Sequence, residues 1–208
     1  MNFKNMIKNI SLKKKLSSDW FKNLQDIICN EFQKLENEFA RKNKQKPKLF
    51  KKKSWRKLKN NGGGTYALIR NGALFDSVGV NFSNVSGKFQ KKFRNQILGA
   101  SKKPNYWASG ISVVAHMKNP NIPAMHFNTR FIITSKNWFG GGIDCTPSIK
   151  DTEERRFFHK EIKFICDKYN KNYYPKYKKW CDDYFYLPHR KETRGIGGIF
   201  FDYKKENW

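Results

Sequence analysis

Long hydrophobic runs, closely spaced cysteines and an ample supply of acidic residues are all missing from this chain of 208 residues. No stretch approaches the roughly 18 consecutive apolar residues that a membrane-spanning helix needs, so we predict a soluble protein with no membrane span. Asp and Glu number only 17 against 43 Lys and Arg, which gives a formal net charge of +26. The charge alone is compatible with nucleic acid, an anionic membrane or an acidic small molecule as partner.

The cysteines are few and far apart. They are Cys29, Cys145, Cys166 and Cys181, without a Cys-x-x-Cys pair or the Cys/His spacing of a zinc finger. This pattern indicates free thiols in a reducing compartment, and we therefore expect a cytoplasmic protein.

The distribution of the positive charge weakens the nucleic-acid interpretation. The basic residues are mostly Lys, are spread along the chain and accompany many Asn and Ile residues, as an AT-rich coding sequence would produce. The densest block, residues 42–60, fits a solvated linker better than a phosphate-binding arm. The glycines Gly62–Gly64 lead into a strand and lack the pattern of a phosphate-binding loop. We therefore expect no nucleic-acid partner.

Two regions are expected near the N-terminus. Residues 1–17 are basic and lack both Arg and an apolar signal core, so we interpret them as an arm of a cytosolic protein. From about Ser18 to Asn43, apolar residues recur at three- and four-residue spacing and predict a helix with one buried stripe. The stripe consists of Phe21, Leu24, Ile28, Phe32, Leu35 and Phe39.

The rest of the chain predicts strands followed by helices and a last strand. Residues 61–89 hold short apolar runs separated by turn signals, and residues 131–147 hold another strand. One helix is predicted to begin near Asp151-x-x-Glu154, and a second to run from Pro175 to before Pro188. RGIGGIFFDY forms a final strand. We therefore predict a single α+β domain over residues 18–208, with a large, mostly antiparallel sheet flanked by helices.

A hairpin is predicted over Ile111–Phe131, with a turn at the segment MKNPNIP. Side chains alternate along a strand, so His126, Asn128 and Arg130 share one face. If both arms expose their polar residues on the same side, His116 joins them. The alternative is that this face is only the solvated side of a half-buried sheet.

Single titratable residues elsewhere allow two interpretations each. Asp144 follows Gly140–Gly142 directly, so it could lie at the floor of a pocket or begin a turn that caps the next helix. His159 lies beside the apolar stripe of its predicted helix. His189 follows the end of the last helix, where it could cap the helix or point into a cleft.

Four long motifs in the same order resemble the oxygen-dependent coproporphyrinogen III oxidases of haem synthesis. They extend from about Phe21 to Asp202 without large gaps. The motifs are GGGTYALIRNGALFDSVGVNFSNVSG, SGISVVAHMKNPNIPAMHFNTRF, WFGGGIDCTP and YPKYKKWCDDYFYLPHRKETRGIGGIFFD.

The resemblance implies a reaction and a partner. Two propionates of coproporphyrinogen III would be oxidatively decarboxylated to vinyl groups, with O₂ as co-substrate, giving protoporphyrinogen IX, CO₂ and peroxide. It implies a homodimer built around an antiparallel sheet, with no organic cofactor.

The resemblance also implies roles for individual residues. His126 matches the position assigned as proton donor, and Asp144 is implied to lie in the pocket, where a carboxylate can accept the pyrrole N–H groups. Ser112, Asn128, Thr129 and Arg130 match substrate-contacting positions. His116, His126, His159 and His189 match positions proposed as divalent-metal ligands in some members.

The resemblance ends before the family's full length. The family's C-terminal third, which carries further catalytic and dimerisation segments, has no counterpart in this sequence. The chain could be one half of a split enzyme completed by a second polypeptide, an inactive porphyrin-binding remnant, or an incomplete piece. A basic RNA-binding or scaffold protein is a separate alternative, which salt-sensitive binding to generic RNA would indicate.

Overall fold

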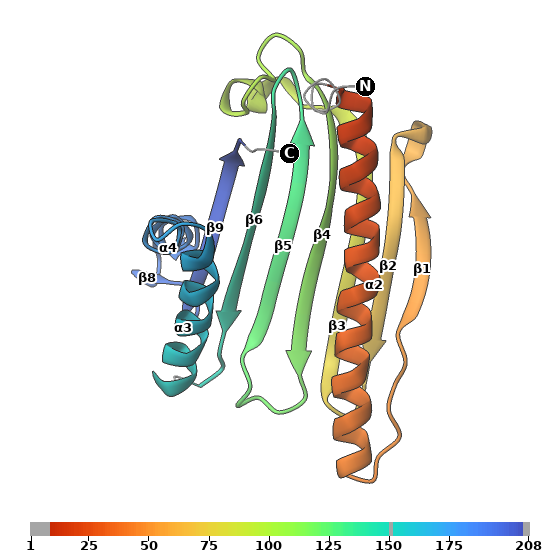
Figure 1. Cartoon of the computed structure of the whole chain (residues 1–208), viewed down its shortest axis with the longest axis vertical. Helices are drawn as coiled ribbons and strands as arrows, with labels where there is room; N and C mark the ends of the chain where they lie inside the picture. The colour runs from red at the N-terminus through yellow and green to blue at the C-terminus, as the bar shows by residue number, and fades with distance from the viewer. Residues whose placement is uncertain (1–8, 150–151, 206–208) are drawn as a thin grey trace.

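The structure, a computed structural model, describes residues 9–149 and 152–205 and is built on one large antiparallel sheet (Figure 1). Its seven strands lie in the order β1-β2-β3-β4-β5-β6-β9, and a two-stranded hairpin, β7-β8, stands apart. Helices flank the sheet, which confirms the predicted α+β class.

The bounds of the elements follow chain order. The helices are α2 (Ile10–Lys42), α3 (Thr152–Tyr169) and α4 (Tyr173–Tyr184), with short 3₁₀ turns η1 (Leu58–Asn60) and η2 (Lys91–Gln96). The strands are β1 (Lys51–Arg56), β2 (Gly62–Arg70), β3 (Phe75–Lys88), β4 (Asn105–Met117), β5 (Ala124–Ile133), β6 (Asn137–Thr146), β7 (Tyr186–Leu187), β8 (Glu192–Thr193) and β9 (Gly197–Lys204).

The main core lies between one face of the sheet and α2. Alternate residues of β2 to β5 point to this face and meet apolar residues of the helix, because successive side chains of a strand point to opposite sides. The buried set is Phe21, Cys29, Ala67, Val80, Phe82, Ile111, Val113, Phe131 and Ile133. We call this side of the sheet the helix face and the other side the polar face.

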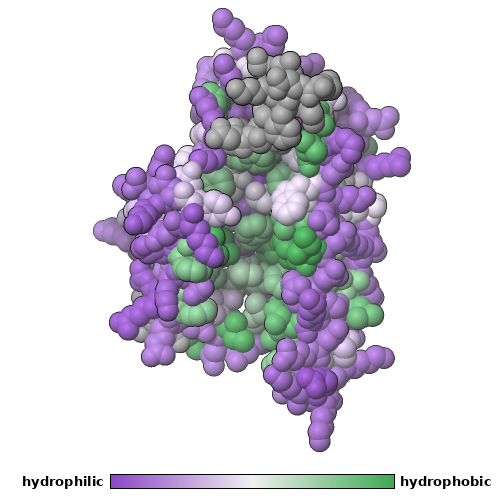
Figure 2. All heavy atoms as spheres, in the orientation of Figure 1, coloured by the Kyte–Doolittle hydropathy of each residue, from purple (hydrophilic) through white to green (hydrophobic). Residues whose placement is uncertain are grey.

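A groove separates α2 from α3 and α4 on the helix face. Figure 2 shows hydrophobic side chains in the hollow between α2 and α3. The groove has a volume of about 550 Å³ and is lined by Trp20, Thr129, Phe139, Tyr173 and Phe201, among others. It is continuous with the core and lies on the opposite side of the sheet from the polar residues of the predicted hairpin.

Helix α2 begins earlier than the sequence predicts. Its N-cap is Asn9, whose side-chain oxygen accepts hydrogen bonds from the backbone N–H groups of Ser11 and Leu12. Residues 10–17 are therefore helical, although they were expected to belong to the basic arm. The apolar spacing that identified the helix starts only at Phe21, so periodicity did not locate its first turns.

The buried stripe of α2 also differs from the prediction in its second half. Leu35 and Phe39 are exposed at 49% and 38%, whereas Gln25 and Glu36 are buried. Glu36 takes this position because its carboxylate accepts hydrogen bonds from backbone N–H groups of the β2–β3 turn. A polar residue thus occupies the face that spacing assigned to apolar ones.

The basic segment 42–60, predicted as a solvated linker, contains strand β1. This strand pairs with β2 and forms one edge of the sheet, with Lys51 opposite Leu68 and Arg56 opposite Gly63. Lysines on an edge strand discourage pairing with further chains, so this composition suits the position although it gave no strand signal.

The two later helices agree with the prediction in outline. Helix α4 begins at Tyr173, before Pro175, and ends at Tyr184. Asp151, the predicted cap of α3, lies outside the described residues. The apolar spacing of Phe158, Ile162 and Ile165 predicts that all three are buried; Ile162 is, but Ile165 is 57% exposed, so this prediction is only partly correct. Among the described helices, none is long and apolar enough to cross a membrane.

Candidate functional site

The polar face gathers most of the predicted site residues. The predicted hairpin is formed by β4 and β5, in which Ser112 lies opposite Asn128 and Val114 opposite His126. Strand β6 then places Asp144 beside His126 and Gly142 beside Asn128. Because paired residues in neighbouring strands point to the same side, Ser112, His126, Asn128 and Asp144 share one face.

Asp144 is the buried centre of this face. Its residue is only 5% exposed, and its Oδ2 atom accepts a 2.7 Å hydrogen bond from Nη2 of Arg194. The Nδ1 atom of His126 lies 3.5 Å from the same oxygen and has no hydrogen bond within the described structure. A buried carboxylate needs a positively charged partner, and the guanidinium of Arg194 provides it. The imidazole is thus within reach of a carboxylate and retains an unused ring nitrogen.

Arg194 was not singled out in the sequence. It lies between β8 and β9, and its guanidinium lies 3.9 Å from the centre of the Phe185 ring. The ring fixes the plane of the guanidinium and its Nη2 atom binds Asp144. The run RGIGG predicts only a strand, because nothing in the spacing of Arg194 and Asp144 indicates that they meet.

Arg130 forms a second cluster on the polar face. Its Nη1 atom donates to Oδ1 of Asn128 at 2.7 Å, and its Nη2 atom donates to Oδ2 of Asp202 at 2.8 Å. The indole of Trp138 donates to the other oxygen of Asp202 at 2.8 Å. Gly140 permits this approach, because a Cβ there would lie 2.4 Å from Asp202 Oδ1. The guanidinium is therefore held in one orientation.

Ser112 and Thr129 are placed differently from each other. Ser112 is exposed on the polar face, where an incoming molecule can reach it. Thr129 is adjacent to Asn128 and Arg130 in sequence, but it points to the helix face and lines the groove there. Alternation along β5 separates its side chain from the other predicted substrate-contacting side chains.

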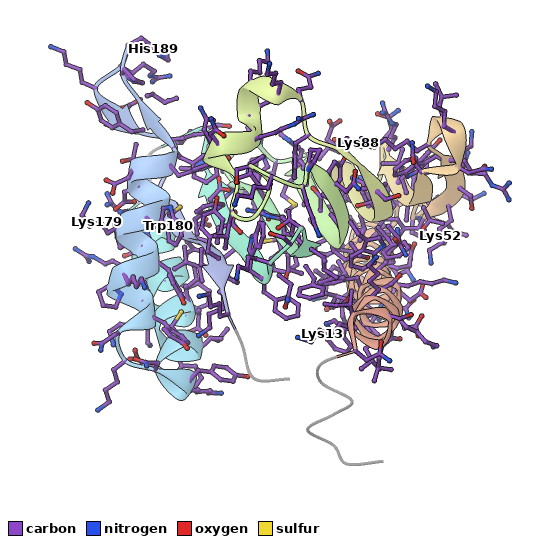
Figure 3. All side chains as sticks on the ribbon, turned by 90° about the horizontal axis from the view of Figure 1, so that it is seen from above. Lys13, Lys52, Lys88, Lys179, Trp180 and His189 are labelled. Atoms are coloured by element: carbon purple, nitrogen blue, oxygen red, sulfur yellow. The ribbon has the colours of Figure 1, made fainter. Side chains whose placement is uncertain are left out.

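The four histidines occupy three separate environments. The ring centres of His116 and His126 are 6.2 Å apart. His159 has both ring nitrogens engaged, since Nε2 lies 2.7 Å from the carbonyl oxygen of Ile196 and Nδ1 lies 3.1 Å from the Tyr174 hydroxyl. Figure 3 shows His189 at the outer end of the β7–β8 hairpin, where it is exposed.

The hydrogen bonds of His159 define its protonation. A carbonyl oxygen only accepts, so Nε2 carries the proton, and Nδ1 accepts from the Tyr174 hydroxyl. Burial lowers the pKa of His159 below its usual value, although the bond to the Ile196 carbonyl opposes this effect. The neutral ring thus joins α3, α4 and the segment before β9.

Known proteins match this sequence over most of its length. The sequence profile of the family described as coproporphyrinogen III oxidase matches residues 17–208. The chain belongs to the coproporphyrinogen III oxidase family. Proteins named oxygen-dependent coproporphyrinogen-III oxidase from Rickettsia rickettsii (strain Sheila Smith) and Rickettsia africae (strain ESF-5) are each 54% identical to it over 190 residues. The alignment covers 91% of this chain and 67% of either relative.

The metal positions proposed for some coproporphyrinogen III oxidases do not form one site here. His159 uses both nitrogens, His189 is at an exposed tip, and His116 and His126 lie together on the sheet. Within residues 9–149 and 152–205, no three His, Cys, Asp or Glu side chains gather in a way that could hold a metal ion. The donor set therefore does not fit a shared ion within one chain.

The cysteines of this coproporphyrinogen III oxidase family member are all free and buried. Burial, and then the carboxylate of Asp144, raises the pKa of Cys145 to about 12. Cys181 has its pKa raised to about 12 by the same two causes. Because only the thiolate is a good nucleophile, the raised pKa values oppose a nucleophilic role for these two thiols.

Proposed function

We propose that the protein acts on coproporphyrinogen III, converting two of its propionates to vinyl groups with O₂ and so forming protoporphyrinogen IX. At each propionate a C–H bond and the bond to the carboxyl carbon break, a C=C bond forms and CO₂ leaves. The two electrons released pass to O₂, which takes up two protons to give peroxide.

The observation that supports this activity best is the pairing of His126 with Asp144 beside Asn128 and Arg130 on one polar face. A porphyrinogen carries pyrrole N–H donors at its centre and carboxylates at its rim. The face offers a carboxylate for the first and guanidinium and amide donors for the second. Membership of the coproporphyrinogen III oxidase family supports the same assignment.

In this proposal Asp144 accepts hydrogen bonds from the pyrrole N–H groups. Arg194 orients the carboxylate through the bond to Oδ2, while Oδ1 remains for the substrate. His126 moves a proton through its imidazole, whose buried Nδ1 atom faces Asp144 at 3.5 Å and has no hydrogen-bond partner among the described residues. A positioned imidazole suits this task because its usual pKa is close to neutral pH.

Arg130 and Asn128 bind a propionate in this proposal, and Ser112 contributes a hydroxyl. Asp202 keeps the guanidinium of Arg130 in place before the substrate arrives. Thr129 is not included, because its side chain lies on the helix face. No step is assigned to a metal ion, since the histidines do not gather around one position.

We also propose that the active form contains more than one polypeptide. Ser112 and His116 are exposed, whereas the reaction needs a site that excludes water. A second copy of the chain, as in a homodimer, or a complementing C-terminal polypeptide would cover the polar face. Four free, buried cysteines support action in the cytoplasm.

The test is to incubate the purified chain with coproporphyrinogen III without oxygen, admit O₂ and follow the vinyl product by chromatography. The assay is run with the chain alone and with extract from its source. We expect His126→Ala to lower the rate by about 10² to 10⁴-fold, because proton transfer by a positioned group contributes on that order. Asp144→Asn should also impair turnover.

Asp183→Asn is the matched control, since Asp183 is exposed on α4 and pairs only with Lys179 at the surface. Its activity should equal that of the unchanged chain. Binding of the macrocycle without product under every condition would contradict the proposed activity and would identify a porphyrin-binding protein that no longer catalyses. A requirement for extract would point to the complementing polypeptide.

A further inference from the structure

A row of three polar side chains crosses the polar face from β3 to β5. Asn81 on β3 lies opposite Ser112 on β4, and Ser112 lies opposite Asn128 on β5. The pairing puts all three side chains on the same side of the sheet. Asn81 is the member of this row that neither the motifs nor the site geometry above assigned a role.

The amide of Asn81 has no partner in the part of the chain that the structure describes. The residue is half-buried, and among the described residues no hydrogen bond involves its side chain. By contrast, Asn84 on the same strand points to the helix face and donates to the Ser18 hydroxyl at 2.9 Å. The Asn81 amide is therefore left to hydrogen-bond with water or with a ligand that reaches the polar face.

On the polar face, one position between Asn81 and His126 carries no side chain. Gly79 lies two residues before Asn81 on the same face and pairs with Val114, which pairs with His126. A Cβ at Gly79 would meet only side-chain atoms, Leu68 Cδ2 at 3.1 Å and Asn81 Nδ2 at 3.8 Å. Gly79 itself carries no side chain, so beside Leu68 the backbone is uncovered and the edge of a flat ring can approach it.

We propose that Asn81 is a further substrate-binding residue, which donates from its side-chain amide to a propionate of the macrocycle lying flat over Gly79 and Val114. Adjacent strands are about 4.8 Å apart, so Asn81 and Asn128 are roughly 10 Å apart and can hold opposite sides of one ring. This inference rests on the proposed function and extends its binding surface from β5 to β3.

The test measures binding separately from turnover. For binding, coproporphyrin III, the air-stable oxidised ring, is titrated into the chain and its variants while fluorescence is recorded. For turnover, KM and kcat are measured with coproporphyrinogen III, using the chain alone or with extract, whichever is active. Asn81→Ala and the similarly sized Asn81→Leu should each raise Kd and KM about tenfold, as loss of a hydrogen bond to a charged group does. The kcat value should change less than about twofold, because the bond is present before and during the reaction.

Two further variants separate this role from a structural one. Asn84→Ala removes an asparagine side chain of the same strand that points to the helix face instead. It should therefore lower the stability of the fold and leave the Kd for the porphyrin unchanged. Gly79→Val fills the bare surface without meeting backbone atoms, so the chain should fold and bind the ring more weakly.

Unchanged binding by Asn81→Ala would overturn the proposal, as would weakened binding that Asn84→Ala shares. Normal binding by Gly79→Val would overturn the flat placement of the ring over β3. If the unchanged chain, both alone and with extract, binds the porphyrin but gives no vinyl product, the proposed activity fails while the Asn81 binding test still stands. If it binds no porphyrin either alone or with extract, both proposals fall together.

Discussion

Two buried carboxylates, Glu36 and Asp144, are stabilised by different partners. Glu36 is completely buried and accepts hydrogen bonds from the backbone N–H groups of Lys48, Ala73, Leu74 and Phe75. Asp144 instead meets the guanidinium of Arg194. The first carboxylate ties α2 to the β2–β3 turn, and the second serves the candidate site.

We predict that Glu36→Gln destabilises the fold by about 2 kcal/mol at neutral pH, because charged hydrogen bonds are lost and buried N–H groups lose partners. Burial alone would raise the pKa of Glu36, but the four backbone hydrogen bonds outweigh it and lower the pKa. The stabilisation is therefore complete above the unfolded pKa of about 4.3 and is lost as pH falls through the lower folded value. Urea unfolding from neutral to acid pH should show the difference between the two proteins shrinking.

The control is Glu38→Gln, since Glu38 lies on the same helix but is half exposed and pairs with Lys42. It should leave stability nearly unchanged. Equal stability of the Glu36→Gln variant and the unchanged chain at pH 7 would contradict the role given to these hydrogen bonds.

At the residue scale, sequence reasoning found the face but not every contact. Alternation along β5 correctly separated His126, Asn128 and Arg130 from Phe127 and Thr129. It did not find Arg194, Asp202 or the contacts of Glu36 with the β2–β3 turn, because these partners are 50, 72 and at least 37 residues apart in the chain. Such contacts depend on the register of whole strands, which a local pattern does not contain.

At the scale of elements, α2 is the longest helix and joins most of the sheet to its core. It contacts β3 and β4, and buried Gln25 donates to the backbone carbonyls of Thr65 and Val80. Its first two turns extend beyond the apolar stripe and depend on the cap at Asn9. The helix end was predicted within one residue, whereas its beginning was not, because basic residues without apolar spacing gave no signal.

We predict that Asn9→Ala destabilises the protein by about 1 kcal/mol, because the cap accepts two backbone N–H groups that otherwise have no helical partner. Amide exchange at Ser11 and Leu12 should accelerate much more than exchange near Phe21. Asn37→Ala, at an exposed position within the same helix, should not change exchange at the helix start. Unchanged exchange at Ser11 in the Asn9→Ala variant would contradict the cap.

Strand β1 shows the same limitation at the element scale. The strands with alternating apolar residues, β3, β4 and β5, were found from sequence because one of their faces is buried. Strand β1 has five exposed residues and one half-buried residue, Trp55, so its sequence carries almost no burial pattern. Only its pairing with β2 makes it a strand.

At the scale of the whole molecule, the sheet has one apolar face and one polar face. The helix face carries the core and the apolar groove, and the polar face carries the candidate site. The fold class and the residues of the polar face could be predicted from the hydrophobic periodicity of the strands together with the family resemblance. The net charge of +26 did not help to predict the fold class or the site. Its lysines lie mainly on exposed positions, and an exposed lysine does not indicate a particular partner.

The order of the strands also determines how the sheet assembles. From β1 to β6 every strand pairs with the next one along the chain, so each pairing joins strands that are neighbours in sequence. Strand β9 instead joins β6 after two helices and a hairpin, which makes its pairing the most distant in the sheet.

We therefore predict that β9 docks last. Pulsed amide-exchange labelling during refolding should show that the amides of β9 become protected after those of β3, β4 and β5. Protection of β9 together with these strands would contradict this order. Because Arg194 immediately precedes β9, Asp144 gains its guanidinium partner only in this final step, and folding intermediates would hold the sheet without a finished site.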